Sequence, residues 1–156
     1  MKTILIFDRM LGRFSLYGAI KMPFVHDLKD FPIVRFDAAS IYEGYGDRWC
    51  DEMDELLARN QPFVLIYLAI GDESDADRFK RGAWLKRNKD AMALNLLALI
   101  HVEPNEEKRQ KLQTMLPKLV VAFGTPQAAR ASVSEAEALA RQLLAGDALC
   151  EATPAA

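Results

Sequence analysis

The stretch from Phe63 to Ile70 constrains the fold more than any other part of the chain. All of its residues are apolar or aromatic, and Pro62 and Gly71 bound it. A run this short, rich in β-branched and aromatic residues and without polar alternation, is typical of a strand covered on both faces. The sequence therefore predicts a sheet with helices packed against it.

Other strands and helices are expected on either side of this run. Short β-rich or apolar stretches predict strands at 3–7, 14–20, 31–36, 95–102 and 129–133. Apolar residues at helical spacing predict helices at 47–60, from 74 onward, at 112–123 and at 134–144. Pro117 would kink or break the third of these helices, and 119–123 alone also fits a strand; we favour the kinked or broken helix.

Capping residues and solvent-facing positions follow from the same helical patterns. Asp47 is the expected N-cap of the first helix, and Ser74 with Asp77 forms a capping box at the start of the second. Ser134 with Glu137 is expected to cap the last helix. The polar face of the first helix is assigned to Glu52, Asp54, Glu55 and Arg59. The apolar stripe of the second is assigned to Ala76, Phe79, Ala83 and Trp84.

Alternation of strands and helices from Phe63 onward predicts βαβ units within one α/β domain. A chain of 156 residues most often forms one domain. We expect a mixed sheet of four to six strands covered by about four helices in residues 1–146. Within it, 1–37 forms extended segments or a meander and 47–145 the alternating part. Residues 147–156 are expected to be a disordered tail.

Composition excludes several classes of function. The net charge of −2 and the pI of about 5.7 argue against a nucleic-acid-binding protein, which usually carries a strongly basic face. Asp8 and Arg9 cut off the apolar start of the chain, and no stretch approaches the roughly 20 apolar residues of a membrane span. We therefore expect a cytoplasmic protein, with Cys50 and Cys150 as free thiols.

The sequence contains no recognisable catalytic or metal-binding motif. Nucleophile-elbow, phosphate-loop and dinucleotide-binding patterns are all missing. His26 falls in an early polar loop without a paired acid, and His101 falls at the end of a strand. Two isolated histidines and two isolated thiols have no metal-ligand spacing, so no metal and no cofactor is expected. A non-enzymatic protein is predicted, and an enzyme with an unfamiliar site near His101 is an alternative.

The acidic turn at 72–77 is the most prominent local feature. It follows the central strand and precedes a helix, at the sheet edge where ligands bind in open α/β folds. Its carboxylates would repel a phosphate but could hold a cation or a basic partner. The candidate partner-binding residues are Asp72, Ser74, Asp75, Arg81 and Arg87. The candidate lining of a pocket between the sheet and the second helix is Phe79, Trp84 and His101.

The order of these features resembles the small bacterial STAS/SEC14-like domains, akin to sporulation anti-anti-sigma factors. The features that carry the resemblance are a strand at 32–36, a helix ending Leu56-Leu57-Ala58-Arg59-Asn60, a strand at 64–69, a basic helix containing Ala83-Trp84-Leu85-Lys86-Arg87, a strand at 97–102 and a closing helix from Ser134. They cover about three quarters of the chain and leave out its first thirty residues.

This resemblance implies a non-enzymatic domain used for protein partners or, in some members, for an apolar ligand. Anti-sigma antagonists carry a phosphorylatable serine in the turn between strand and helix, and Ser74 occupies the matching place. Glu73 and Asp75 replace the small residues of that motif, so a phosphate here would meet carboxylates. We expect an STAS-like regulatory module that binds another protein, with a small-molecule or lipid-binding domain as the alternative. A homodimer is also compatible with the sequence.

Overall fold

The computed structural model describes residues 24–37, 41–68 and 72–151 of the 156-residue chain. Its strands are β1 (His26–Asp27), β2 (Ile33–Phe36), β3 (Phe63–Tyr67), β4 (Leu96–Val102) and β5 (Gln127–Arg130). Its helices are α2 (Gly46–Ala58), α3 (Asp75–Arg87), α4 (Lys89–Asn95), α5 (Glu106–Phe123) and α6 (Val133–Leu144). The strands predicted at 3–7 and 14–20 lie outside the described residues.

The strands form one mixed sheet in the order β1-β2-β3-β4-β5. β1 pairs antiparallel with β2, whereas the pairs β2–β3, β3–β4 and β4–β5 are parallel. Every residue of β3 is buried, as its unbroken apolar sequence predicts. The prediction of a single α/β domain with a mixed sheet of four to six strands is thus confirmed.

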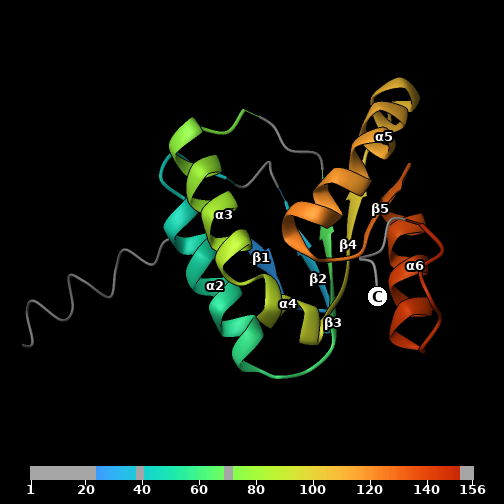
Figure 1. Cartoon of the computed structure of the whole chain (residues 1–156), viewed down its shortest axis with the longest axis horizontal. Coiled ribbons are helices and arrows are strands. Elements are labelled where there is room, and N and C mark those ends of the chain that lie inside the picture. Colours follow the sequence, from blue (N-terminus) through green and yellow to red (C-terminus); the bar gives the residue numbers. More distant parts are fainter. Residues whose placement is uncertain (1–23, 38–40, 69–71, 152–156) are drawn as a thin grey trace, which may run out of the picture.

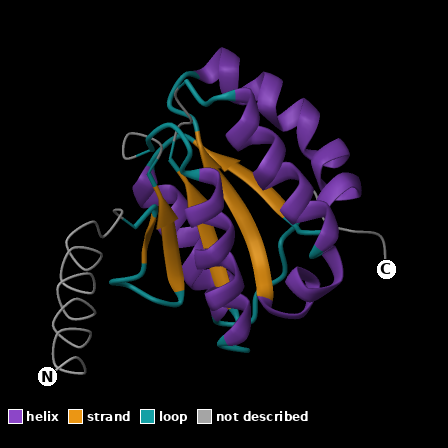
Figure 2. Cartoon of the chain, turned by 90° about the vertical axis from the view of Figure 1, so that its left-hand side faces the viewer, coloured by secondary structure: helices purple, strands orange, loops and turns teal. Residues whose placement is uncertain are grey.

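Helices cover both faces of this sheet (Figures 1 and 2). Each parallel connection moves to the next strand in the same direction, so right-handed crossovers place α2 to α5 on one face. α6 follows β5 and packs on the opposite face, against β3 and β4. The core on the α2 side is dominated by the aromatic side chains of Phe36, Tyr45, Trp49, Phe63, Tyr67 and Trp84. The core on the α6 side consists of aliphatic residues such as Ile66, Ile100 and Leu143.

Two helices bury charged residues that the sequence pattern assigns to solvent. In α2 the buried face includes Glu52 beside Trp49 and Met53, so its predicted place on the polar face is wrong. In α3 the buried residues are Asp77, Arg81, Trp84 and Leu85, whereas Phe79 is 77% exposed. Burial of these charges is tolerated because each finds a charged or hydrogen-bonding partner inside.

Several predicted helix ends need correction. Tyr45, not Asp47, is the N-cap of α2, and its side chain makes no capping bond. Ser132, not Ser134, caps α6 by accepting a hydrogen bond from the Glu135 amide at 3.2 Å. The short helix α4 was not predicted.

The C-terminal third agrees with the sequence-based expectation in part. A helix at 112–123 is confirmed, but α5 begins earlier, at Glu106, and continues through Pro117 unbroken to Phe123. Its C-cap is Gly124, whose φ of 69° suits glycine. The segment predicted to be a disordered tail contacts the rest of the domain as far as residue 151. Leu149 packs against the α6-side core, and Glu151 Oε1 lies 2.6 Å from Arg130 Nη2.

Candidate functional site

The acidic turn lies at the carboxyl edge of the sheet, between β3 and α3. Ligands of open α/β sheets bind at this edge where the strand order reverses. The described strands follow one another without a reversal, so they form no such crevice.

Ser74 and Asp77 form a capping unit that joins α3 to the loop before α2. Ser74 Oγ accepts from the Asp77 amide at 3.1 Å and donates to Asp77 Oδ2 at 2.7 Å. The Asp77 carboxylate also accepts from the amides of Gly46 at 2.8 Å and Gly44 at 2.9 Å. Burial raises the pKa of Asp77, but these hydrogen bonds outweigh it and hold the pKa below the usual value. The capping box predicted at Ser74 is confirmed, and its hydroxyl is engaged within the cap.

Arg81 and Glu73 form a buried ion pair beneath this turn. Arg81 Nε and Nη2 donate to the two oxygens of Glu73 at 2.6 and 2.7 Å, and Tyr45 Oη donates to Glu73 Oε1 at 2.6 Å. The Arg81 guanidinium also lies over the ring of Trp49, 5.6 Å from its centroid. Burial raises the pKa of Glu73, but Arg81 and Tyr45 together hold it below its usual value. The prediction that Arg81 contacts a partner is therefore wrong, because the fold encloses its charge with that of Glu73.

A second buried charge cluster joins the edge strand β1 to α2. Glu52 accepts from the amides of Val25 and His26 at 3.1 and 2.9 Å, from His26 Nδ1 at 2.7 Å and from Arg48 Nε at 2.9 Å. Burial lowers the pKa of His26 in spite of the Glu52 carboxylate. His26 thus lies in a strand with a paired acid, and its prediction as an unpaired loop residue is wrong. One signal pointed to this: Glu52 shares its helix face with Trp49, Met53 and Leu56.

The residues predicted to line one ligand pocket are dispersed in the structure. Phe79 faces solvent, whereas Trp84 is 1% exposed and donates its Nε1–H to Asp54 Oδ1 at 2.9 Å. His101 Nε2 donates to Gln127 Oε1 at 2.8 Å, and burial lowers the His101 pKa despite this bond. His101 lines a hollow of about 260 Å³ with Tyr67 and other residues of the β3 and β4 ends. The prediction that these three residues line one pocket is therefore wrong.

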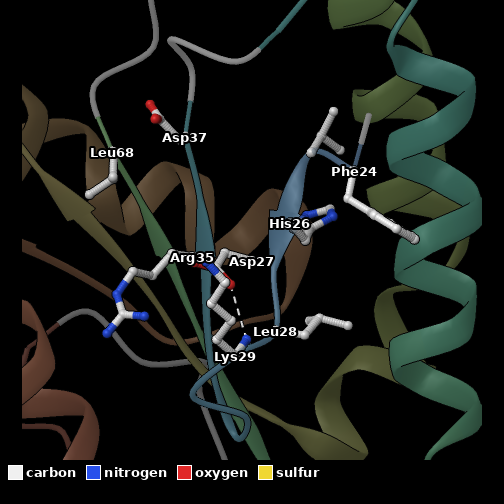
Figure 3. A pocket seen from close by; sticks show the side chains of 9 residues that line it. Phe24, His26, Asp27, Leu28, Lys29, Arg35, Asp37 and Leu68 are labelled. Atoms are coloured by element: carbon white, nitrogen blue, oxygen red, sulfur yellow. Dashed lines mark hydrogen bonds between the residues drawn. The ribbon is translucent and has the colours of Figure 1, made fainter. Parts of the chain in front are cut away.

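A larger hollow of about 520 Å³ lies beside the edge strand β1 (Figure 3). It is lined by Phe24, Val25, His26, Asp27, Leu28, Lys29, Arg35, Asp37 and Leu68. Arg35 is already paired, since its Nη1 donates to Asp30 at 2.6 Å and its Nε to Glu137 at 2.9 Å. The charges of the two acidic and two basic residues in the lining balance, and most of the other lining residues are apolar.

The solvent-facing side of α3 carries the other predicted partner residues. We call it the α3 outer face and define it by Asp75, Ala76, Phe79, Gly82, Ala83, Lys86 and Arg87. A Cβ added at Gly82 would meet nothing within 4 Å, so no packing inside the domain requires glycine there. Asp72 is exposed just before this helix.

The described residues contain no group of three or more His, Cys, Asp or Glu side chains that could hold a metal ion. Within the same part of the chain, no helix is both long and apolar enough to cross a membrane. Comparisons with protein-family models, curated proteins and solved structures found no match for this chain. The STAS-like resemblance therefore rests on the sequence features alone.

Proposed function

We propose that this protein is a non-catalytic interaction module that binds a protein partner through the α3 outer face. The observation that carries the proposal is the exposure of Phe79. This side chain is 77% exposed in the middle of α3, whose other exposed residues are mostly charged. Exposed aromatic anchors ringed by polar residues are typical of interface hot spots. Gly82 and Ala83, one turn further along, leave room for another chain to approach closely.

The charges around Phe79 indicate the chemistry of the partner. Lys86 and Arg87 are exposed and make no hydrogen bond or ion pair to another described residue. Asp75 lies at the opposite end of the same face; its side chain is 97% exposed, and its Oδ1 lies 3.2 Å from Arg78 Nη1. The face therefore suits an apolar surface flanked by carboxylates near the C-terminal end of α3.

Replacing Phe79 with serine is expected to abolish partner binding without unfolding the domain. Loss of an anchor of this kind weakens binding by roughly tenfold or more. Tagged wild-type protein and the Phe79→Ser variant would be incubated with extract of the native cells, and the captured proteins quantified by mass spectrometry. Val121→Ser is the matched control, because Val121 on α5 is 76% exposed but lies off this face. An identical set of captured proteins for all three would contradict the proposal.

A second candidate function is the binding of a neutral apolar molecule in the hollow beside β1. Its volume of about 520 Å³ falls in the range of small-molecule sites, roughly 300–1,000 Å³. Phe24, Leu28 and Leu68 supply apolar surface, and the balanced charges favour an uncharged ligand.

Filling this hollow is expected to reduce binding of a neutral fluorescent probe, N-phenyl-1-naphthylamine. Emission of the probe should rise with the wild-type protein and rise roughly fivefold less with Leu68→Trp, because the indole occupies the space. Val121→Trp adds the same group on α5 and should leave the titration unchanged. Equal titrations for wild type and Leu68→Trp would rule out this site.

A further inference from the structure

A small hollow lies at the carboxyl ends of β3 and β4, beside the start of α5. Its volume is about 260 Å³, and the polar residues of its lining include His101, Glu103 and Lys108. The other lining residues are apolar or aromatic. We infer that this hollow binds a small α-amino acid with an apolar side chain, held by its ammonium and carboxylate groups. The inference goes beyond the proposed function, because the hollow shares no residue with the α3 outer face.

Parallel pairing of β3 and β4 brings the lining residues together. Tyr67 and His101 are register partners near the ends of these strands, and their rings meet edge to face with centroids 5.8 Å apart. Glu103 directly follows β4, and Lys108 lies in the first turn of α5. The carboxyl ends of parallel strands are where α/β proteins bind their ligands. The strand order does not reverse here, so the hollow is formed by α5 beside the strand ends and not by a crevice between strands.

His101 has one ring nitrogen available to a ligand. Its Nε2 donates to Gln127 Oε1 at 2.8 Å, and Gln127 is 1% exposed on β5. An amide oxygen only accepts hydrogen bonds, so the proton lies on Nε2 and Nδ1 is an acceptor. Burial lowers the pKa of His101, so the ring is neutral near neutral pH. Nδ1 has no hydrogen-bond partner among the described residues, which leaves it for a donor such as an ammonium group.

Glu103 and Lys108 supply opposite charges that the domain leaves unpaired. The Glu103 residue is half-buried, and its Oε1 accepts from the Asn105 amide at 2.9 Å. The nearby Arg109 Nη1 donates to the Glu103 backbone carbonyl at 3.0 Å and not to this carboxylate. Lys108 is exposed, and only its backbone amide is hydrogen-bonded. In the part of the chain that the structure describes, neither charge forms an ion pair with the other or with a further residue.

A free α-amino acid matches this set of groups. Its ammonium group is a donor for Glu103 and His101 Nδ1, and its carboxylate is a partner for Lys108. Leu112 and Leu68, which also lines the hollow beside β1, offer contacts for an apolar side chain. The volume is below the roughly 300–1,000 Å³ of sites for drug-sized ligands, so a small molecule fits best. We expect a Kd of about 1 mM, because few atoms make contact.

Nuclear magnetic resonance of the histidine side chains in the full chain tests the inference. The protein has only two histidines, so the ring signals of His101 are simple to assign. Those of His26, which is bonded to Glu52, serve as an internal reference. L-valine should shift the His101 Nδ1 signal saturably. Isovalerate lacks its ammonium group and isobutylamine lacks its carboxylate, so each should bind roughly tenfold more weakly. An unchanged His101 signal with L-alanine, L-valine and L-leucine, or equally tight binding of either analogue, would overturn the inference.

Matched substitutions test the two charged residues of the hollow. Glu103→Gln should weaken L-valine binding by roughly tenfold, and Lys108→Met by roughly threefold because water screens the exposed ammonium more strongly. Glu107→Gln and Lys111→Met are the controls. These two residues are exposed on the same helix and lie 2.8 Å apart as an ion pair of their own, so their replacement should leave binding unchanged. Equal effects of the test and control substitutions would show that the overall charge of α5 attracts the amino acid, and would overturn the site.

Discussion

Replacing Glu52 with alanine is expected to lower the free energy of unfolding by about 3–5 kcal/mol, because it removes the shared acceptor of several buried donors. The carboxylate is the shared acceptor for the amides of Val25 and His26, for His26 Nδ1 and for Arg48 Nε. Without it, the two amides and the imidazole lose their partner in a buried environment, and each orphaned donor costs about 1–3 kcal/mol.

Glu52 links β1 to α2, so its replacement should destabilise the edge of the sheet first. Hydrogen exchange of the Val25 and His26 amides should accelerate more than exchange in β3. Urea unfolding monitored by circular dichroism measures the free energy of unfolding of the whole domain. Glu55→Ala, at an exposed position of the same helix, should change stability by less than about 0.5 kcal/mol. Equal effects of the two substitutions would show that the cluster does not stabilise the fold.

The contribution of Glu52 should also depend on pH. Burial raises the pKa of this carboxyl, but its bonds to His26 and to the amides outweigh burial and bring the pKa below the usual value. A carboxyl with a lowered folded-state pKa stabilises the protein fully above its unfolded pKa of about 4.3. That stabilisation is lost as the pH falls through the folded-state pKa. The stability difference between wild type and Glu52→Gln should therefore be constant near neutral pH and narrow in acid.

Replacing Arg81 with methionine is expected to lower the free energy of unfolding by a similar amount, about 3–5 kcal/mol. Methionine keeps the apolar stem but removes the buried guanidinium that pairs with the Glu73 carboxylate, whose side chain is 3% exposed. Tyr45 Oη still donates to Glu73 Oε1, and the exposed Arg78 keeps its Nε 3.9 Å from Glu73 Oε2, but a neutral donor and a solvent-screened charge at this distance do not replace the buried partner. The contact of the guanidinium with the Trp49 ring is lost as well.

The double variant Glu73→Gln, Arg81→Met separates the pair from the single residues. Removing both charges should be less destabilising than the sum of the single substitutions, with a coupling energy of about 0.5–3 kcal/mol. Arg87→Met is the matched control, because Arg87 is exposed on the same helix and should contribute less than about 0.5 kcal/mol. Additive effects in this cycle, measured by urea unfolding, would contradict the assignment of Arg81 to an internal ion pair.

Local sequence was sufficient to predict the elements whose signals lie within a few residues. The apolar run at 63–70 identified the central strand, Ser74 and Asp77 identified the start of α3, and Gly124 identified the end of α5. Each of these depends on backbone geometry or on side chains close in the chain, so no distant contact was needed. A mixed sheet of four to six strands followed from the alternation of strands and helices, and the described sheet has five.

The candidate site was harder to predict because charge alone does not show which side of a helix faces inward. Arg81 was assigned to the surface for its charge, and Phe79 to the interior for its aromatic ring. In the structure both are reversed. Glu73 lies two residues before α3, and its buried carboxylate accepts a hydrogen bond from Arg81. With Arg81 on the buried face of the helix, Phe79 lies on the exposed face.

The sequence by itself therefore determined the α/β fold class, the central strand, the start of α3 and the end of α5, since these follow from propensity, periodicity and local capping. Only the tertiary structure decided which charges are buried. Val25 and His26 meet Glu52 across more than 25 residues of chain, and the loop at Gly44 and Gly46 meets Asp77 across more than 30. A charge is stable inside a protein only when its partner is fixed beside it, and packing of β1 against α2 and of α2 against α3 supplies these partners.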